Sequence, residues 1–219
     1  GGKYSERAGV MRGLTCTCKD DKNPNSGISY LDIHDNFALA DQFGRNFDGR
    51  DSVYENEYKI AVTLLYTTLG PIVTHGGSEI MRSKAHAPLR EEVRTTKAGY
   101  NAYMHGYRDT YNHRTANTFV WEQVGQKPTG TNYNDYDNMY KFWRGWNTFR
   151  KSEYGKVFRQ GEAVPEGYYK WFLPEPESAL GYLVDDKVLV LINAGHEPID
   201  FENVELPKGK WQLVGTSDA

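Results

Sequence analysis

A strand–helix–strand pattern between residues 27 and 76 constrains the fold of this chain more than any other feature. Residues 28–33 (Ile-Ser-Tyr-Leu-Asp-Ile) and residues 71–75 (Pro-Ile-Val-Thr-His) are both typical of short β-strands. Between them, apolar residues recur at three- and four-residue steps from Tyr58 to Leu65, which predicts a helix with one apolar face. The pattern therefore predicts a βαβ unit with parallel strands and a right-handed crossover.

Side-chain chemistry marks the expected ends of this helix. Ser52 and Glu55 have the spacing of a capping box, in which each side chain binds the backbone amide of the other residue. Gly70 stands where the end of a helix favours a left-handed residue. We therefore expect a helix of about five turns that begins at Ser52.

The middle of the chain divides into a loop region and a second helix. Residues 76–133 are rich in Gly, Asn, His, Arg and Tyr, and we expect them to form ordered loops that line a site. Residues 135–152 return to helical periodicity, and their aromatic stripe is more typical of a core than of a ligand surface. The stripe consists of Tyr136, Met139, Tyr140, Trp143, Trp146 and Phe149.

From residue 166 onward, short β-prone runs alternate with turn residues, which predicts a small antiparallel β domain. Hairpin turns are expected at Asp185-Asp186 and at Lys208-Gly209. The expected strands are residues 168–172, 179–184, 188–192, 199–201 and 211–214.

Composition narrows the class of protein. A count of 26 Lys and Arg against 29 Asp and Glu gives a net charge of −3, which argues against a nucleic-acid-binding surface. No apolar run approaches the roughly 20 residues of a membrane span, and no signal segment stands at the start. The chain opens at Gly1 with no Met before Met11, as expected of a processed or trimmed piece. Aromatic residues make up 14% of the chain, enough for a core and for the stacking surfaces that sugars use.

The two cysteines, Cys16 and Cys18, are separated by one residue. Two positions apart in an extended chain, their side chains lie too far from each other for an unstrained disulfide. No further ligands stand at metal-site spacing, so we expect two plain thiols.

Three polar residues, His34-Asp35-Asn36, follow the first expected strand directly. Active sites of parallel α/β folds gather at the carboxyl ends of strands, so this position favours a functional role. A loop-capping Asp beside a surface His is the alternative. The second strand ends in residues 75–79 (His-Gly-Gly-Ser-Glu), where paired Gly lets the backbone approach a ligand or form a tight turn.

The order of these motifs resembles the α-amylase clan of glycoside hydrolases (glycoside hydrolase family 13), and within it the type I pullulanases and related starch-debranching enzymes. Residues 28–41 look like the seventh barrel strand with the clan's last catalytic motif, and residues 70–84 look like the eighth strand and its exit. Residues 109–112 (Asp-Thr-Tyr-Asn), Asn117 and Trp121 resemble the Asn-Ser-Tyr-Asn and Asn-x-x-x-Trp patterns of debranching enzymes.

The resemblance continues to residue 214. Residues 140–151 resemble the last barrel helix, and the β-rich tail matches the C-terminal β domain of the clan. The sequence departs from the pattern at Val120, where relatives commonly have Asp, and at Ala40, where many pullulanases have Trp. The resemblance implies an α/β plus all-β fold. Residues 1–165 would form the C-terminal portion of a catalytic (β/α)8 TIM barrel, with strands 7 and 8 and their helices, and residues 166–219 a small antiparallel β-sandwich.

The resemblance also implies roles for individual residues. Asp35 would be the catalytic carboxylate that holds the hydroxyls of the sugar in the −1 subsite and stabilises the positively charged transition state, and His34 would donate to a hydroxyl of the same sugar. The implied substrate-binding residues are His34, Asn36, Glu79, Arg82, Asp109, Tyr111, Asn112 and Asn117.

The function that follows is part of a retaining glycoside hydrolase cleaving α-1,6 (debranching) linkages in pullulan, glycogen or starch. The clan's nucleophile and acid/base motifs precede the seventh strand, so the chain alone is expected to be inactive, and the remaining N-terminal part of the barrel is an expected partner. An α-1,4-acting amylase-type hydrolase and a non-catalytic carbohydrate-binding or interaction fragment are the alternatives.

The expected ligand is an α-glucan oligosaccharide or polysaccharide, with no nucleic acid and no membrane span. The resemblance requires no cofactor, and no acidic ligand loop indicates Ca2+, although calcium sites vary within the clan. Localisation is not readable from the sequence, and a secreted or cell-surface enzyme fits the resemblance.

Overall fold

The computed structural model of the chain describes residues 6–16, 23–47, 50–84, 111, 114, 117–130 and 132–217. The chain forms two compact units that both draw on distant parts of the sequence. The first unit combines residues 1–29, 63–73 and 146–218, and the second combines residues 30–62 and 74–145. Each unit is described below by itself.

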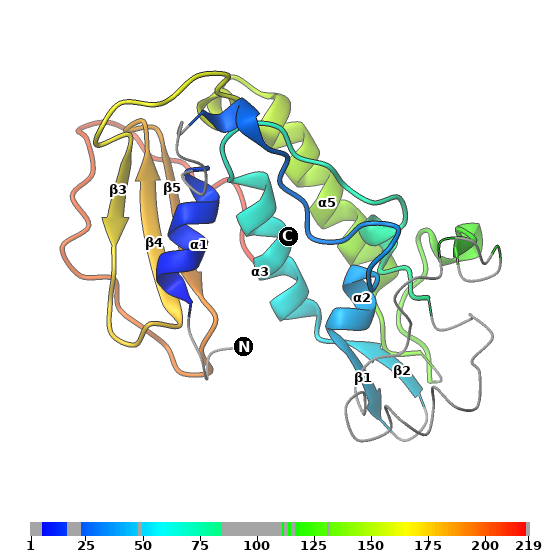
Figure 1. The fold of residues 1–219 in the computed structure, drawn as a ribbon. Coiled ribbons are helices and arrows are strands. Elements are labelled where there is room, and N and C mark those ends of the chain that lie inside the picture. Colours follow the sequence, from blue (N-terminus) through cyan, green and yellow to red (C-terminus); the bar gives the residue numbers. More distant parts are fainter. Residues whose placement is uncertain are drawn as a thin grey trace. The chain divides into compact units, whose positions relative to one another are not determined.

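A three-stranded antiparallel sheet forms the β part of the first unit (Figure 1). Its strands are β3 (Tyr169–Phe172), β4 (Ala179–Val184) and β5 (Val188–Asn193), with β4 in the centre. All six residues of β4 are buried, as expected for a central strand covered on both faces. Asp185 and Asp186 have φ angles of +50° and +53°, the left-handed values that a two-residue hairpin turn requires. The first three expected strands and the Asp185-Asp186 turn are confirmed.

The last two expected strands were wrong. Residues 199–201 and 211–214 are irregular, and Leu213 and Val214 are 79% and 66% exposed. β-Prone residues form a strand only when a neighbour pairs with them, and in the described residues nothing pairs with these two runs as a strand. Within the described part of the first unit the sheet is a single layer, so the expected sandwich is not confirmed.

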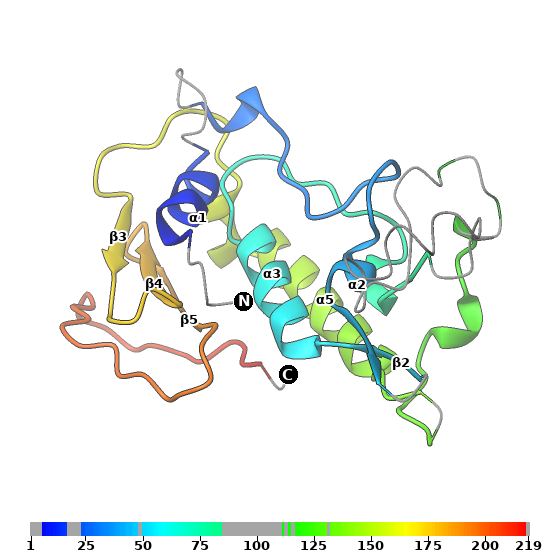
Figure 2. The same cartoon turned by 60° about the horizontal axis from the view of Figure 1, so that its bottom comes forward.

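A short helix that the sequence patterns missed, α1 (Arg7–Leu14), lies beside this sheet (Figures 1 and 2). The Arg7 guanidinium donates to the carbonyl oxygens of Pro174 and Ala179 at 2.7 and 3.2 Å. At the other end of the helix, the buried hydroxyl of Tyr169 donates to the Leu14 carbonyl oxygen at 3.4 Å. Two glycines within eight residues weaken the helical signal of this segment, and tertiary contacts supply what its propensity lacks.

The expected parallel pairing is present at one point of contact. Ser29 and Ile72 form an isolated parallel bridge, in which the Ser29 amide donates to the Pro71 carbonyl and the Val73 amide donates to the Ser29 carbonyl. The two segments are therefore parallel neighbours, as predicted. They do not extend into strands, because the pairing ends after these two hydrogen bonds. Near this contact, Gly70 has a left-handed φ of +76°, and a Cβ there would lie 2.3 Å from the Pro24 carbonyl oxygen. The expected role of Gly70 at the end of the helix was wrong, because the helix ends at Tyr66.

The helix that the βαβ pattern predicted is α3 (Glu55–Tyr66), which has 12 residues. It begins three residues after Ser52, so the capping-box prediction was wrong. Ser52 belongs to strand β2 (Arg50–Val53), which pairs with β1 (Gly44–Phe47) in a hairpin. The Glu55 carboxylate accepts from the Asp135 amide at 2.7 Å instead of reaching back to Ser52. Glu55 thus makes a long-range hydrogen bond to the Asp135 amide in place of the expected short-range capping bond.

The second expected helix is confirmed as α5 (Tyr136–Lys151). Tyr136, Met139 and Trp143 of its aromatic stripe are buried, whereas Tyr140 is 36% exposed. Figures 1 and 2 show α3 and α5 side by side. The Lys59 ammonium of α3 lies 5.6 Å from the ring centre of Phe142 in α5, a cation–π contact.

Arg150 binds the backbone at the end of α3 and just beyond it, in the first unit. Its guanidinium donates to the carbonyl oxygens of Thr68 at 2.9 Å and Phe158 at 3.3 Å, and also to those of Tyr66 and Gly70. Burial lowers the pKa of Arg150 to about 10, which still leaves it charged at neutral pH. Five donors in one plane allow a single side chain to bind four backbone carbonyl groups.

Arg150→Met should lower the free energy of unfolding by about 3 kcal/mol or more, because it leaves several buried carbonyl oxygens without a donor. Equilibrium urea unfolding of the chain followed by tryptophan fluorescence measures this change. Lys151→Met, at the exposed neighbouring position, is the matched control and should change stability by less than about 0.5 kcal/mol. Equal effects of the two substitutions would contradict the role given to Arg150.

Candidate functional site

The residues His34, Asp35 and Asn36 form an exposed turn in the second unit, directly before the short helix α2 (Leu39–Gln42). The Asn36 amide donates to the Ile33 carbonyl at 3.1 Å, which closes the turn. The Asn36 side-chain oxygen accepts from the Phe37 amide at 2.8 Å. These bonds use backbone groups and the Asn36 side chain. Asp35 is exposed, so its carboxylate is accessible to a ligand.

Lys84 lies beneath this turn and is completely buried, with an exposed fraction of 0%. Its ammonium donates to the carbonyl oxygen of His34 at 2.8 Å and to that of Asn36. Burial lowers the pKa of Lys84, and the nearby Arg82 adds to this effect, while Asp41, Asp32 and Asp35 act in the opposite direction. Hydrogen bonds to backbone carbonyls and the attraction of the nearby carboxylates therefore offset the cost of removing this charge from water.

Asp41 fixes the chain at Lys84 from α2. Its carboxylate is fully buried and accepts from the Lys84 amide at 2.8 Å and from the Ser83 hydroxyl. A buried carboxylate needs such donors because leaving water costs it several kcal/mol. The result is a closed connection from α2 through Asp41 to Lys84 and back to the turn at residues 34–36.

Asp32 forms the second buried carboxylate of the unit, with an exposed fraction of 4%. It accepts from the Leu39 amide at 3.0 Å and from the Ser78 hydroxyl at 3.0 and 3.1 Å. The His75 ring nitrogen Nδ1 lies 3.4 Å from the same carboxylate. The sequence prediction treated Asp32 as an ordinary strand residue. The one available signal was a charged side chain inside an otherwise apolar run.

Two of the expected substrate-binding residues, Glu79 and Arg82, bind the protein's own backbone. The Glu79 carboxylate accepts from the Gly77 amide at 2.9 Å. Arg82 is 4% exposed, and its Nε donates to the Gly76 carbonyl at 3.2 Å. Burial lowers the pKa of Arg82, and Asp32 is the first of the charges that counteract this. Both residues shape the loop that follows Ile72, and their assignment to substrate stays a prediction.

Tyr111 lies against the turn, with its ring 6.1 Å from the ring of His34 and almost perpendicular to it. It is 62% exposed, so most of its surface remains accessible. Asn117 is half-buried in a separate loop segment. Asp109 and Asn112 lie outside the described residues. Of the expected binding residues, the structure thus brings Tyr111 against His34, which shares the turn with Asp35 and Asn36.

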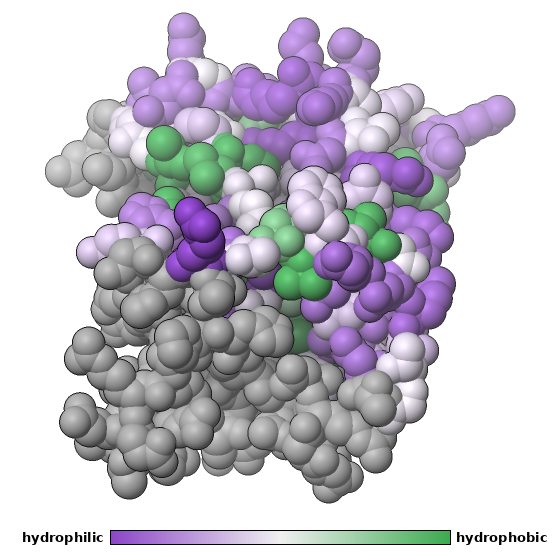
Figure 3. Space-filling view, turned by 90° about the vertical axis from the view of Figure 1, so that its right-hand side faces the viewer, coloured by the Kyte–Doolittle hydropathy of each residue, from purple (hydrophilic) through white to green (hydrophobic). Residues whose placement is uncertain are grey.

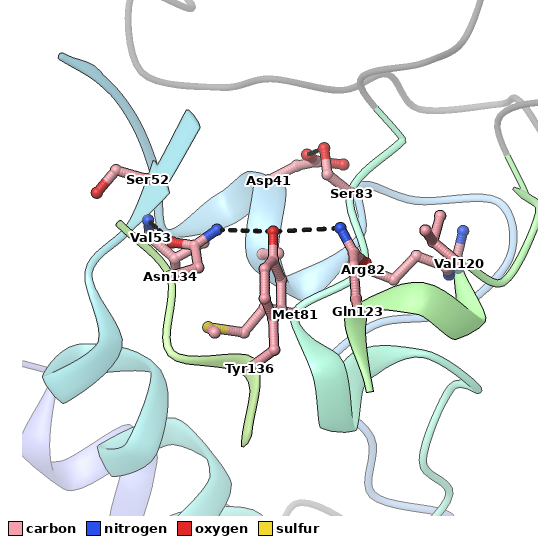
Figure 4. A pocket seen from close by; sticks show the side chains of 11 residues that line it. Asp41, Ser52, Val53, Met81, Arg82, Ser83, Val120, Gln123, Asn134 and Tyr136 are labelled. Atoms are coloured by element: carbon pink, nitrogen blue, oxygen red, sulfur yellow. Dashed lines mark hydrogen bonds between the residues drawn. The ribbon is translucent and has the colours of Figure 1, made fainter. Parts of the chain in front are cut away.

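A small cavity of about 40 Å3 lies next to this network within the second unit (Figure 4). Tyr136 lines it, and its hydroxyl oxygen accepts from the side-chain amides of Gln123 at 3.2 Å and Asn134 at 3.3 Å. Asn134 in turn accepts from the Val53 amide at 2.9 Å. The volume suits a few water molecules and is far below the roughly 300 Å3 of a small-molecule pocket. The open turn at Asp35 is therefore the better candidate for a ligand.

The surface in Figure 3 mixes hydrophilic residues with small, separate hydrophobic patches. Among the residues that the structure describes, no group of three His, Cys, Asp or Glu side chains could hold a metal ion. No described helix is long and apolar enough to cross a membrane. Cys16 donates from its thiol to the Leu69 carbonyl at 3.0 Å, and Cys18 lies outside the described residues.

Comparison with known proteins adds a structural relationship. The chain is similar to the catalytic module of the multi-modular glycogen-degrading pneumococcal virulence factor SpuA, solved in complex with an inhibitor. The TM-score is 0.62 at 17% sequence identity, and the match covers 84% of this chain and 30% of that module's chain. No family model and no curated protein sequence matches the chain. At this identity the likeness shows the fold alone, which is similar to that of a part of the SpuA catalytic module.

Gly77 allows the Arg82 side chain to pass close to the backbone, which gives a test of this network. Its φ of +100° disfavours any side chain, and a Cβ would lie 2.7 Å from Cδ of Arg82. Gly77→Ala should therefore lower the free energy of unfolding by about 1–3 kcal/mol. Gly76→Ala is the control, since a Cβ at Gly76 meets no atom within 4 Å. Thermal unfolding by circular dichroism measures both, and an unchanged melting temperature for Gly77→Ala would contradict the packing described.

Proposed function

We propose that the chain is one part of a retaining glycoside hydrolase that cleaves α-1,6 linkages in pullulan, glycogen or starch. The observation that carries this proposal is the exposed carboxylate of Asp35, presented on a turn whose backbone is held from below by buried Lys84. Along the chain, the turn begins five residues after Ser29, which forms an isolated parallel bridge with Ile72. Parallel α/β enzymes present reactive groups after the carboxyl ends of their strands, and the family resemblance implies this position for residues 34–36.

The chemistry of Asp35 follows from its charge and exposure. Glycoside cleavage passes through an oxocarbenium-like transition state, which a carboxylate on a fixed turn stabilises more than it stabilises the neutral substrate. His34, in the same turn and in ring contact with Tyr111, supplies a donor or acceptor for a sugar hydroxyl. The exposed Tyr111 ring adds a flat surface on which a sugar can stack.

The fold similarity supports this proposal, because the matching structure belongs to a glycogen-degrading enzyme. The chain spans about 30% of that module's chain. We therefore assign the activity to a longer polypeptide in which other segments supply the nucleophile and the acid/base carboxylate. In this proposal, residues 1–165 belong to the catalytic barrel, residues 166–219 form a C-terminal β domain, and the ligand is an α-glucan.

Asp35→Asn, made in the polypeptide that also carries the nucleophile and acid/base motifs, should lower kcat on pullulan by about 10²-fold or more. The amide keeps the size of the side chain and removes the charge that the transition state needs. Asp35 is exposed, so the melting temperature should stay within the error of the parent. Glu166→Gln, at another exposed carboxylate, is the control and should retain full turnover. Normal turnover by Asp35→Asn would reject the assigned role.

The bond specificity can be tested with two substrates. The complete polypeptide should release maltotriose from pullulan and leave unbranched amylose intact, since only pullulan contains α-1,6 linkages. Chromatography of the products measures both reactions. Hydrolysis of amylose alone would assign an α-1,4-acting enzyme, and binding of either glucan without any product would assign a carbohydrate-binding role.

A further inference from the structure

We propose that Lys84 is a positioning residue for Asp35, acting through the backbone of the turn at residues 34–36. The inference rests on the proposed function, because it concerns how the Asp35 carboxylate is aligned with a sugar. It adds a residue that never touches the substrate and yet sets the geometry of the reaction.

The two carbonyl groups that Lys84 binds belong to the residues on either side of Asp35. The ammonium donates to the His34 carbonyl oxygen at 2.8 Å and to the Asn36 carbonyl oxygen as well. The His34 carbonyl belongs to the peptide group between residues 34 and 35, and the Asn36 carbonyl belongs to the one between residues 36 and 37. With both held by one nitrogen atom, the backbone dihedrals of Asp35 and Asn36 cannot change without breaking a charge-assisted hydrogen bond.

The ammonium can act as a fixed point because its own chain segment is held independently. Asp41 accepts from the Lys84 amide and from the Ser83 hydroxyl, and it is fully buried. Asp32 accepts from the Leu39 amide at the start of α2, which carries Asp41. The turn is thus connected to two buried carboxylates through a chain of hydrogen bonds.

A purely structural role would not favour a lysine at this place. Burying an ammonium is costly, and well-packed apolar side chains often stabilise a protein as well as buried charges do. The acceptors of the Lys84 ammonium are the two turn carbonyls, so its hydrogen bonds are directed at the backbone that carries Asp35. Asp35 is also among the charges that attract the ammonium and raise its pKa. The hydrogen bonds of Lys84 to the turn and its electrostatic attraction to Asp35 therefore both bear on the Asp35 carboxylate.

The test uses the complete polypeptide with pullulan as the substrate. Lys84→Met, which keeps the length of the side chain and removes its charge, should lower kcat by about 10²-fold, as expected for a misplaced reacting group, and change KM by less than about twofold. Lys84→Arg, which retains donors and charge, should recover at least about a tenth of the lost turnover. Lys156→Met, at an exposed lysine, is the control and should be unaffected.

A double-mutant cycle separates positioning from general stabilisation. Because Lys84 acts through Asp35, the variant with both Asp35→Asn and Lys84→Met should be no slower than Asp35→Asn alone. Multiplied losses in the double variant would overturn the inference, as would a normal kcat for Lys84→Met. Normal turnover by Asp35→Asn would instead reject the proposed function itself.

A milder variant covers the case in which Lys84→Met does not fold. Lys84→Gln keeps a donor and loses the charge, and it should show a reduced kcat in a protein of nearly unchanged melting temperature. Faster hydrogen exchange at the Asn36 amide, which closes the turn on Ile33, should accompany the loss. Unchanged exchange together with unchanged kcat would overturn the inference.

Discussion

Two buried carboxylates, Asp32 and Asp41, hold the second unit in its arrangement. Each lies almost wholly out of water and would be costly without donors, so the segments that supply those donors cannot move away from them. The donors come from α2 and from residues 75–84, on the far side of α3 in the sequence. The buried cations Arg82 and Lys84 come from the same segment, so opposite charges are removed from water together. The exposed turn at Asp35 is the outer surface of this arrangement.

In the first unit, a buried cation takes the place of the buried carboxylates and binds backbone carbonyl groups. The carbonyl groups of Tyr66, Thr68 and Gly70 lie at the end of α3 or beyond it and need donors from elsewhere. Arg150 of α5 supplies the donors, and Phe158 joins the same guanidinium. Thr67 completes the connection to the sheet, because its hydroxyl bonds the buried Tyr182 hydroxyl at 2.6 Å and its carbonyl accepts from Tyr169 at 3.0 Å. In both units, buried charged side chains make hydrogen bonds to backbone groups.

Features with local causes could be predicted from the sequence, and those with distant causes could not. The helix at residues 136–151 and the hairpin at Asp185-Asp186 follow from periodicity and turn chemistry within a few residues. The start of α3 was missed because Glu55 bonds an amide 80 residues away. The turn at Asp35 could be located from its sequence motif. The contacts of Lys84 could not, because its partners are distant in the sequence.

The separation along the chain between Lys84 and the turn has a consequence for assembly. The hydrogen bonds from its ammonium join residues 50 and 48 positions apart, and the bond from its amide to Asp41 spans 43. Closing such a loop has an entropic cost that local contacts cannot offset early in folding. The local hydrogen bonds of the turn are those of the Asn36 amide to Ile33 and of the Phe37 amide to the Asn36 side chain, and the others await residues 75–84, so the turn acquires its final shape after α3 has formed and these residues have docked. The candidate site is thus a late product of folding, and an isolated peptide of residues 28–42 would not retain its geometry.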